Sequence, residues 1–308
     1  MSQKQSRREF LMNGALLGAG VLISNRAVNL LDLTRIPIEK IDLSIVRGDD
    51  YYASTIKAVE ALGGMKRFVS KGSTVGILVN SRYNKPGAYV KPEITLAAIT
   101  LCLGAGAKKI ISLENVQDSY WHLNSFSKDY SEAIGDLKYA GNNFKKAKIQ
   151  RGISLKDAEV EADFLDCDTY INIPIFKQHE GVRITGCLKN LMGLTSQDTN
   201  RYFHSGSKAG DGYSNLPFLS QCIADVNLLR KPDLCIADAT EYITTNGPFG
   251  PGEIVKAKKV VAGTDIVAVD SMGAKILGYD SGDIMPIRLA YKNGLGEIDL
   301  SKVKIRES

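Results

Sequence analysis

The chain has few of the motifs on which cofactor chemistry usually depends. It contains five cysteines but no Cys-x-x-Cys pair, so local spacing encodes neither a ferredoxin-type cluster nor a zinc ribbon. It lacks Gly-x-Ser-x-Gly, which disfavours a serine hydrolase, and it has neither a phosphate-binding loop nor a Gly-x-Gly-x-x-Gly dinucleotide motif. The sequence therefore names no cofactor, and it carries no iron–sulfur cysteine motif.

Basic residues are not arranged as a surface for nucleic acid. The formal net charge is +5. The first 27 residues contain four basic residues, Lys4, Arg7, Arg8 and Arg26, and one acidic residue, Glu9, so the net charge of the rest of the chain is closer to zero. No stripe of lysine and arginine is interleaved with aromatic residues. We therefore expect no nucleic-acid partner.

The N-terminal residues resemble a twin-arginine export signal. Arg7-Arg8-Glu9-Phe10-Leu11 precedes an uncharged stretch of thirteen residues, Leu11 to Ile23, which is too short to span a bilayer as a settled helix. We interpret residues 1–27 as the signal, which implies passage through the twin-arginine translocation machinery and a periplasmic or exported location. Asn25-Arg26-Ala27 matches a cleavage site poorly, so an uncleaved, membrane-tethered form stays open. A chance basic start on an amphipathic helix is the alternative.

The cysteines are better explained by packing than by chemistry. Cys102, Cys222 and Cys235 lie in apolar runs, where a free cysteine behaves as a small buried hydrophobe, and Cys187 beside Leu188 is interpreted in the same way. One or two disulfides remain an option in an oxidising compartment.

Hydrophobic periodicity predicts one α/β domain over residues 40–304, with a mainly parallel or mixed sheet flanked by helices. Short β-branched runs alternate with segments of helical spacing, as expected for strands joined by helices. The pattern loosens around 115–165, which we interpret as an insertion or an antiparallel flap. The polar segment 195–214 is expected to be a mobile loop. The expected strands are 41–47, 75–79, 109–113, 144–151, 169–173, 234–237 and 255–262, and the expected helices are 52–69, 92–103, 127–137, 216–229 and 265–277.

Polar residues follow several of the expected strands. In parallel α/β sheets, ligands bind beyond the carboxyl ends of the strands, so these positions are candidates for a shared site. They are Asn80, Glu114, Lys177 with His179, and Asp238.

The segment Lys177-Gln178-His179 is expected to be a loop. Lys177 can hold an anionic ligand, and His179 can act as an acid, a base or a metal ligand because imidazole titrates near neutrality. The alternative is a solvated loop lysine and a histidine hydrogen-bonded to backbone. Lys189 and Asn190 follow among glycines that let backbone approach a ligand, although Lys189 can equally be a helix C-terminal lysine.

Two further features are weaker candidates. Gly247 and Gly250 lie in a stretch rich in glycine and proline whose backbone N–H groups can cradle an anion, with a plain rigid loop as the alternative. A metal site needs His179 and His204 to meet Glu114, Asp238 or Asp270 in space, and nothing in the spacing requires this.

Taken together, these segments resemble the domain-of-unknown-function family 362. Its hallmarks are Asn-x-Pro-x-x-Lys-x-His, here Asn172 to His179, and Leu-Lys-Asn-x-x-Gly, here Leu188 to Gly193. The likeness runs from about Ile41 to Asp299. Relatives usually end the second strand in Lys-Pro-Asn, whereas Leu78-Val79-Asn80 keeps only the asparagine. Many relatives also carry cysteine-rich iron–sulfur segments, which this chain lacks, so an electron-transfer role is weakened.

These observations predict an exported protein that binds an anionic small molecule or cofactor. The pocket is expected to include Lys177, His179, Lys189 and Asn190, with His179 as acid or base. A non-catalytic ligand-binding protein and a metal protein using His179, His204 and carboxylates are the alternatives, and the reaction and oligomeric state are left open. The candidate catalytic residues are His179, Lys177 and Asp238; the candidate ligand contacts are Asn80, Glu114, Asn172, Lys189, Asn190, Gly247, Gly250 and Asp270.

Overall fold

The computed structural model describes residues 41–308, except 115, 117, 124–130 and 206–214. The expected signal, residues 1–27, and the start of the helix expected at 127–137 lie outside the described residues. Ile41–Ser308 forms one unit. Within the described residues, no helix combines the length and apolar character needed to cross a bilayer.

An eight-stranded mixed sheet lies at the centre of this unit, in the order β14-β1-β13-β10-β7-β2-β3-β4. Only β13 runs antiparallel to its neighbours, β1 and β10, while the remaining neighbours pair in parallel. The predicted α/β class with a mainly parallel or mixed sheet is therefore confirmed. The strands are β1 (Leu43–Arg47), β2 (Thr74–Val79), β3 (Lys109–Ser112), β4 (Lys138–Tyr139), β7 (Thr169–Ile173), β10 (Leu234–Ala239), β13 (Lys259–Gly263) and β14 (Ile305–Glu307).

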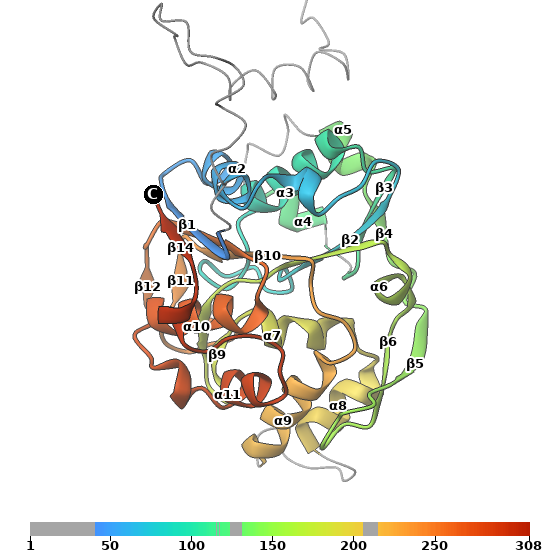
Figure 1. The fold of residues 1–308 in the computed structure, drawn as a ribbon, viewed down its shortest axis with the longest axis vertical. Coiled ribbons are helices and arrows are strands. Elements are labelled where there is room, and N and C mark those ends of the chain that lie inside the picture. Colours follow the sequence, from blue (N-terminus) through green and yellow to red (C-terminus); the bar gives the residue numbers. More distant parts are fainter. Residues whose placement is uncertain (1–40, 115, 117, 124–130, 206–214) are drawn as a thin grey trace, which may run out of the picture. The chain divides into compact units, whose positions relative to one another are not determined.

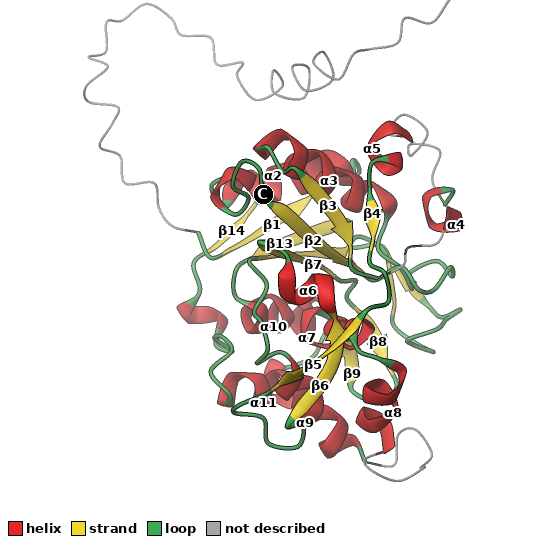
Figure 2. Cartoon of the chain, turned by 90° about the vertical axis from the view of Figure 1, so that its right-hand side faces the viewer, coloured by secondary structure: helices red, strands yellow, loops and turns green. Residues whose placement is uncertain are grey.

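Helices cover both faces of the sheet (Figures 1 and 2). One face packs against α2 (Tyr51–Ala61) and α3 (Pro92–Ala105), and the other against α7 (Cys187–Asn190), α9 (Leu216–Val226), α10 (Ile266–Ile276) and α11 (Met285–Lys292). Side chains alternate along β7: Ile171 and Ile173 belong to the core under α2 and α3, and Tyr170 to the core with α7. Asn172, on the same face as Tyr170, therefore meets α7.

The helix ends follow the local sequence. Asp50 caps α2 by accepting a hydrogen bond from the Ala53 N–H at 2.9 Å. Pro92 occupies the first turn of α3, and Gly106 ends that helix with a φ of 97°. Asp265 accepts from the backbone of Val267 and Ala268 at the start of α10. These capping contacts define where α2 and α10 begin and where α3 begins and ends.

The segment 115–165 contains both an edge strand and a flap. β4 extends the main sheet, whereas β5 (Phe144–Lys148) and β6 (Asp157–Glu161) form a separate antiparallel pair. The buried carboxylate of Asp225 on α9 accepts three N–H groups, from Ile153, Ser154 and Leu155, at 2.7–2.9 Å. The flap is therefore tied to the helical face. The described residues of this region also form the short helices α4 (Asp118–Trp121), α5 (Ser131–Gly135) and α6 (Ala162–Asp166).

Several expectations for local structure were wrong. Lys177–His179 is the short strand β8, paired with β9 (Arg183–Thr185), and not a loop. The expected strand 255–262 divides into β12 (Ile254–Val255), which pairs with β11 (Tyr242–Ile243), and β13, because Lys258 adopts a φ of 56° between them. Within the polar segment 195–214, α8 (Gln197–Ser205) is helical. One-turn 3-10 helices cover Met65–Arg67, Leu191–Leu194, Ser281–Asp283 and Leu300–Lys302.

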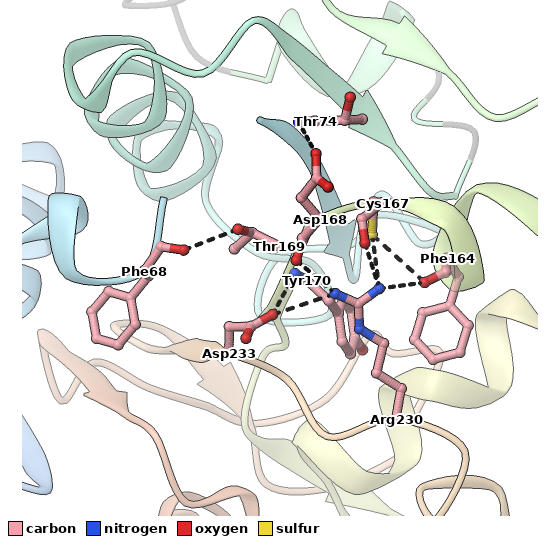
Figure 3. A network of polar contacts seen from close by, with 9 residues as sticks. All are labelled: Phe68, Thr74, Phe164, Cys167, Asp168, Thr169, Tyr170, Arg230 and Asp233. Atoms are coloured by element: carbon pink, nitrogen blue, oxygen red, sulfur yellow. Dashed lines mark hydrogen bonds and ion pairs between the residues drawn. The ribbon is translucent and has the colours of Figure 1, made fainter. Parts of the chain in front are cut away.

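The guanidinium group of Arg230 belongs to a network of polar contacts at the amino ends of β2 and β7 (Figure 3). Arg230 donates to the carbonyls of Phe164, Cys167 and Asp168 at 2.8–3.1 Å and lies 3.5 Å from the Asp233 carboxylate. Asp233 in turn accepts from the Tyr170 N–H at the start of β7. In the same network, Asp168 accepts the Thr74 N–H that begins β2. β2 and β7 are thus anchored at the ends opposite the candidate site.

Candidate functional site

The order in which the chain adds strands to the sheet reverses between β2 and β7. From β2 the chain moves outward to β3 and β4, and later from β7 it moves the other way to β10. Crevices beyond the carboxyl ends of strands at such a switch point are the usual ligand sites of open α/β sheets. The residues that follow β2, β3 and β7 are therefore the first candidates.

Three asparagines connect these strand ends to α7. Asn190 on α7 donates to Asn172 Oδ1 at 2.8 Å and accepts from Asn80 Nδ2 at 3.1 Å, and Asn172 donates to the Cys187 carbonyl at 2.9 Å. The structure therefore brings together three of the predicted ligand contacts. Most of their hydrogen-bonding capacity is used within the protein, although the buried Oδ1 of Asn80 has no partner among the described residues.

Lys177 lies near the same edge, fully buried on β8. Its Nζ donates to the Ala88 carbonyl at 2.6 Å and lies 4.7 Å from the centre of the Tyr83 ring. Among the described residues, no carboxylate pairs with it within salt-bridge distance. Burial, and secondly the positive charge of Lys189, lower the pKa of Lys177 to about 7, against a weaker opposite effect of Glu114. Lys177 is therefore poised to exchange a proton near neutrality.

Lys189 is a second ammonium group without a compensating carboxylate in the described part of the chain. Burial, and then the nearby charge of Arg82, lower its pKa to about 8. The last turn of α7 positions this side chain, and the Asn190 contacts hold that helix against β2 and β7. Two lysines and an arginine thus concentrate positive charge at one edge of the sheet.

Glu114 supplies a carboxyl group next to these cations. Burial raises its pKa to about 7, although Arg82 and Lys177 both act to lower it. Glu114 lines a cavity of about 250 Å³ between the end of β3 and the flap. The lining residues are Ser81, Arg82, Leu113, Glu114, Ala140, Asn142, Phe144, Glu161, Gly193 and Leu194.

His179 is buried and stays neutral. Its Nδ1 accepts hydrogen bonds from the N–H groups of Gly181 and Val182 at 3.1 and 3.4 Å, so the ring proton lies on Nε2. Burial, followed by the charges of Lys189 and Lys177, lowers the pKa of His179 to about 2. His204, whose Nδ1 lies 2.9 Å from the Asn200 carbonyl on α8, acts on the same ring.

The metal site was only an alternative, and the described residues give it no support. His179 and His204 interact electrostatically, but the described residues contain no group of three or more His, Cys, Asp or Glu side chains placed to hold a metal ion. All five cysteines are buried and free, as expected for core residues.

The carboxylates of Asp238 and Asp270 accept hydrogen bonds chiefly from backbone N–H groups. Asp238, which lies inside β10 and not after it, accepts from the N–H and hydroxyl of Thr240 and from the Lys91 N–H, all at 2.7 Å. Asp270 accepts from the N–H groups of Cys187 and Leu188 at 2.6 and 2.9 Å, which caps the start of α7. Burial raises the pKa of both carboxyls to about 6. Their geometry is that of structural anchors.

Gly247 and Gly250 shape a turn that packs on β8. The Gly247 N–H donates to Gln178 Oε1 at 2.6 Å, and its carbonyl accepts from Glu180. Gly250 has a φ of 66°, a conformation that glycine adopts readily. The Gly247 N–H is therefore already used inside the protein and does not form part of an open anion cradle.

Replacing Gly247 by alanine is expected to destabilise the protein. The added Cβ would overlap the Gln178 carbonyl, which is backbone and cannot swing away. We expect a loss of about 1–3 kcal/mol in the free energy of unfolding, as for other overpacked sites. Urea unfolding of Gly247→Ala beside Gly135→Ala, where a Cβ meets nothing, measures this. Equal stability of the two variants would show that the turn is not tightly packed.

The sequence analysis did not select Arg82 or Tyr83. Arg82 lowers the pKa of Lys189, and the Tyr83 ring lies against the Lys177 ammonium group. Both follow Asn80 in the segment after β2, so the strand-end rule that selected Asn80 also reaches them. What the sequence did not show is how that segment turns back: Tyr83 lies over Lys177, and Phe249 packs edge-on against Tyr83 with 5.0 Å between ring centres.

A comparison with protein families defines the class. Residues 75–275 match the family described as "Domain of unknown function (DUF362)", and the chain belongs to that family. The matched range includes every candidate site residue above, the strands β3, β4, β7, β10 and β13, and all but the first residue of β2.

Among individual proteins, the chain is 25% identical over 268 residues to "Thylakoid-associated protein sll1697" of Synechocystis sp., covering 82% of this chain and 79% of that protein. A solved structure of the lactate racemase apoprotein from Thermoanaerobacterium thermosaccharolyticum aligns at a TM-score of 0.49 and 14% identity, over 78% of this chain and 58% of that one. A protein from Thermotoga maritima aligns at 0.37 and 13%, over 80% and 60%. The chain thus spans less than two thirds of either solved protein.

Proposed function

We propose that this protein binds a small anionic molecule at the carboxyl ends of β2, β3 and β7. Lys189 and Arg82 attract the anion, and Lys177 contacts it. The observation that carries the proposal is a chain of neighbouring charges: Arg82 and Lys177 both act on the buried carboxyl of Glu114, whose pKa is raised to about 7, and Lys189 acts on Lys177. Uncompensated like charges are costly to hold together, and such groups concentrate at functional sites.

Proton exchange in this site is assigned to Lys177 and Glu114. Both have a pKa of about 7, so each is present in both protonation states near neutral pH. A histidine with a pKa of about 2 exchanges no proton in that range, so the acid–base role expected for His179 moves to this pair. His179 instead organises the β8–β9 turn through its Nδ1. The alternative is a protein that binds the anion through the same contacts without converting it. Analysis of the products after long incubation distinguishes an enzyme from such a binding protein.

Anion binding is expected to weaken as pH rises from about 6 to 9. Lys177 and Lys189 lose their protons through pKa values of about 7 and 8, and Glu114 gains negative charge over the same range, so all three changes disfavour an anion. Arg82 and Tyr83 also lie beside these groups. We expect a loss of affinity of about tenfold or more. Isothermal titration calorimetry with inorganic phosphate and with pyruvate measures it, and an affinity independent of pH would contradict the assignment.

We also propose that residues 1–27 direct export by the twin-arginine route, with or without cleavage of the signal. The paired arginines followed by Phe10-Leu11 support this, and the relative from Synechocystis bears a name that associates it with a membrane system. Lysine keeps the charge of arginine but not its planar guanidinium. Replacing Arg7 and Arg8 by lysine is expected to retain the full-length protein in the cytoplasm. Cell fractionation with immunoblotting measures this, and unchanged export of the double variant would remove the proposal.

A further inference from the structure

Lys91, which is partly buried, and Lys177, which is fully buried, both lie over tyrosine rings, but their surroundings differ. Lys91 Nζ lies 5.6 Å from the Tyr89 ring centre and 3.4 Å from a carboxylate oxygen of Glu241. Although burial works against it, Glu241 keeps the pKa of Lys91 above its usual value. Lys177 lies over Tyr83 and donates to a neutral carbonyl, and in the described part of the chain it has no carboxylate within 4.0 Å. The structure therefore stabilises the charged form of Lys91 and disfavours that of Lys177.

A lysine that is desolvated and placed beside a second cation has the environment of an amine nucleophile. Such a lysine is partly uncharged at neutral pH, and its lone pair can attack a carbonyl carbon. Lys177 meets both conditions, because it is fully buried and Lys189 adds a nearby positive charge. An ordinary surface lysine with a pKa near 10.5 meets neither.

The groups around Lys177 indicate the charge and the size of a carbonyl compound that fits there. Lys189 and Arg82 favour a carboxylate on the ligand, since no carboxyl group among the described residues offsets Lys189. Glu114 can deliver and accept a proton at the reacting centre. The cavity that Glu114 and Arg82 line, of about 250 Å³, has room for a small molecule only.

We propose that Lys177 is a covalent site that forms an imine with a small oxo acid, whose carboxylate Lys189 and Arg82 hold. This inference rests on the anion-binding function proposed above. The neutral Lys177 Nζ attacks the carbonyl carbon, the carbonyl π bond breaks, and the oxygen takes the proton that the nitrogen loses, which gives a carbinolamine. Protonated Glu114 then donates its proton to the hydroxyl, which leaves as water while the nitrogen lone pair forms the C=N bond, and the remaining N–H proton returns to the Glu114 carboxylate. The overall reaction joins amine and carbonyl with loss of one water, and it needs no oxidant or reductant.

The covering of Lys177 sets a condition on this reaction. Tyr83 lies directly over the ammonium group, and the half-exposed Phe249 packs against Tyr83 from the 245–252 turn. An oxo acid reaches Nζ only when Tyr83 moves aside. Bulk water is excluded in the closed arrangement, which protects an imine from hydrolysis.

Reductive trapping tests the proposal. The full-length protein is incubated with sodium cyanoborohydride and pyruvate, glyoxylate or acetoacetate, and the adducts are located by intact mass and peptide mapping. We expect one reduced adduct on Lys177 with at least one of the three probes, formed fastest near pH 7, because the amine must lose its proton while Glu114 must keep its own. Lys177→Arg keeps a positive charge but cannot form an imine, so it should lower trapping at least about tenfold. Lys91→Arg is the matched control and should leave trapping unchanged.

Two results would overturn the inference, and calorimetry with the same probes separates them. Saturable binding with no adduct on Lys177, or adducts spread over surface lysines equally in wild type and Lys177→Arg, would remove the imine and leave the anion-binding function standing. Neither binding nor trapping with any of the three oxo acids and no binding of phosphate would remove both.

Discussion

Replacing Lys177 by methionine is expected to stabilise the fold while abolishing anion binding. Lowering the pKa of a lysine from 10.5 to about 7 corresponds to a cost of about 4 kcal/mol for holding the charge at neutral pH. Methionine fills similar space without charge, but it leaves the Ala88 carbonyl without its donor. The expected net gain is about 1–3 kcal/mol in the free energy of unfolding.

The pH dependence of this gain follows from linkage. The folded-state pKa of Lys177 lies below its unfolded value, so between about 7 and 10.5 the unfolded state binds more protons. The destabilising contribution of the lysine is complete below about pH 7 and disappears as pH approaches 10.5. The advantage of Lys177→Met should therefore be largest in acid and vanish in alkali. Urea unfolding at several pH values measures it, with exposed Lys57→Met as the control, and a destabilised Lys177→Met would show that the ammonium group is a structural element.

Removing the Asp270 carboxylate is expected to cost about 3–5 kcal/mol of stability. Both of its oxygens accept backbone N–H groups at the start of α7, and alanine would leave the donors of Cys187 and Leu188 buried without a partner. Because α7 carries Lys189 and Asn190, this variant should lose anion binding along with stability. Asp270 thus affects the site through the helix that it caps, without contacting the ligand.

Chemical denaturation of Asp270→Ala beside Asp280→Ala measures this effect. Asp280 also accepts a backbone N–H, from Gly282 at 2.7 Å, but it does so on an exposed turn, so its loss should cost about 1 kcal/mol or less. If Asp270→Ala were as stable as Asp280→Ala and had lost only binding, Asp270 would be a ligand contact after all.

The sequence predicted the architecture because buried parallel strands leave a strong local signal. The apolar runs at 75–79, 109–113 and 169–173 each became a strand, and the rule that ligands bind beyond strand ends selected Asn80, Glu114 and Lys177, which lie near one edge of the sheet. Local failures had local causes. The left-handed Lys258 interrupts the run at 255–262, and the pairing of β8 with β9 depends on a turn of Glu180 to Val182 that apolar periodicity does not detect.

The roles of the carboxylates could not be predicted in the same way. Asp238 was a candidate catalytic residue and Glu114 and Asp270 were candidate ligand contacts, yet the two aspartates accept backbone N–H groups and Glu114 lines a cavity. Whether a carboxylate accepts backbone N–H groups or lines a cavity depends on which segments distant in the sequence, such as 187–188 and 240, lie next to it in the fold. The burial that lowers the pKa of Lys177 depends likewise on Tyr83 and Ala88, which lie far from it in sequence.

The most direct test of the anion site is a charge-matched binding comparison. Isothermal titration calorimetry at pH 6.5 with pyruvate and with inorganic phosphate compares the full-length wild type, Lys189→Met and Lys57→Met, each of the last two having lost one positive charge. The account predicts saturable binding of at least one anion to the wild type and to Lys57→Met, with affinity lower by about tenfold or more in Lys189→Met. Equal affinity in all three proteins, or no saturable binding of either anion, would contradict it.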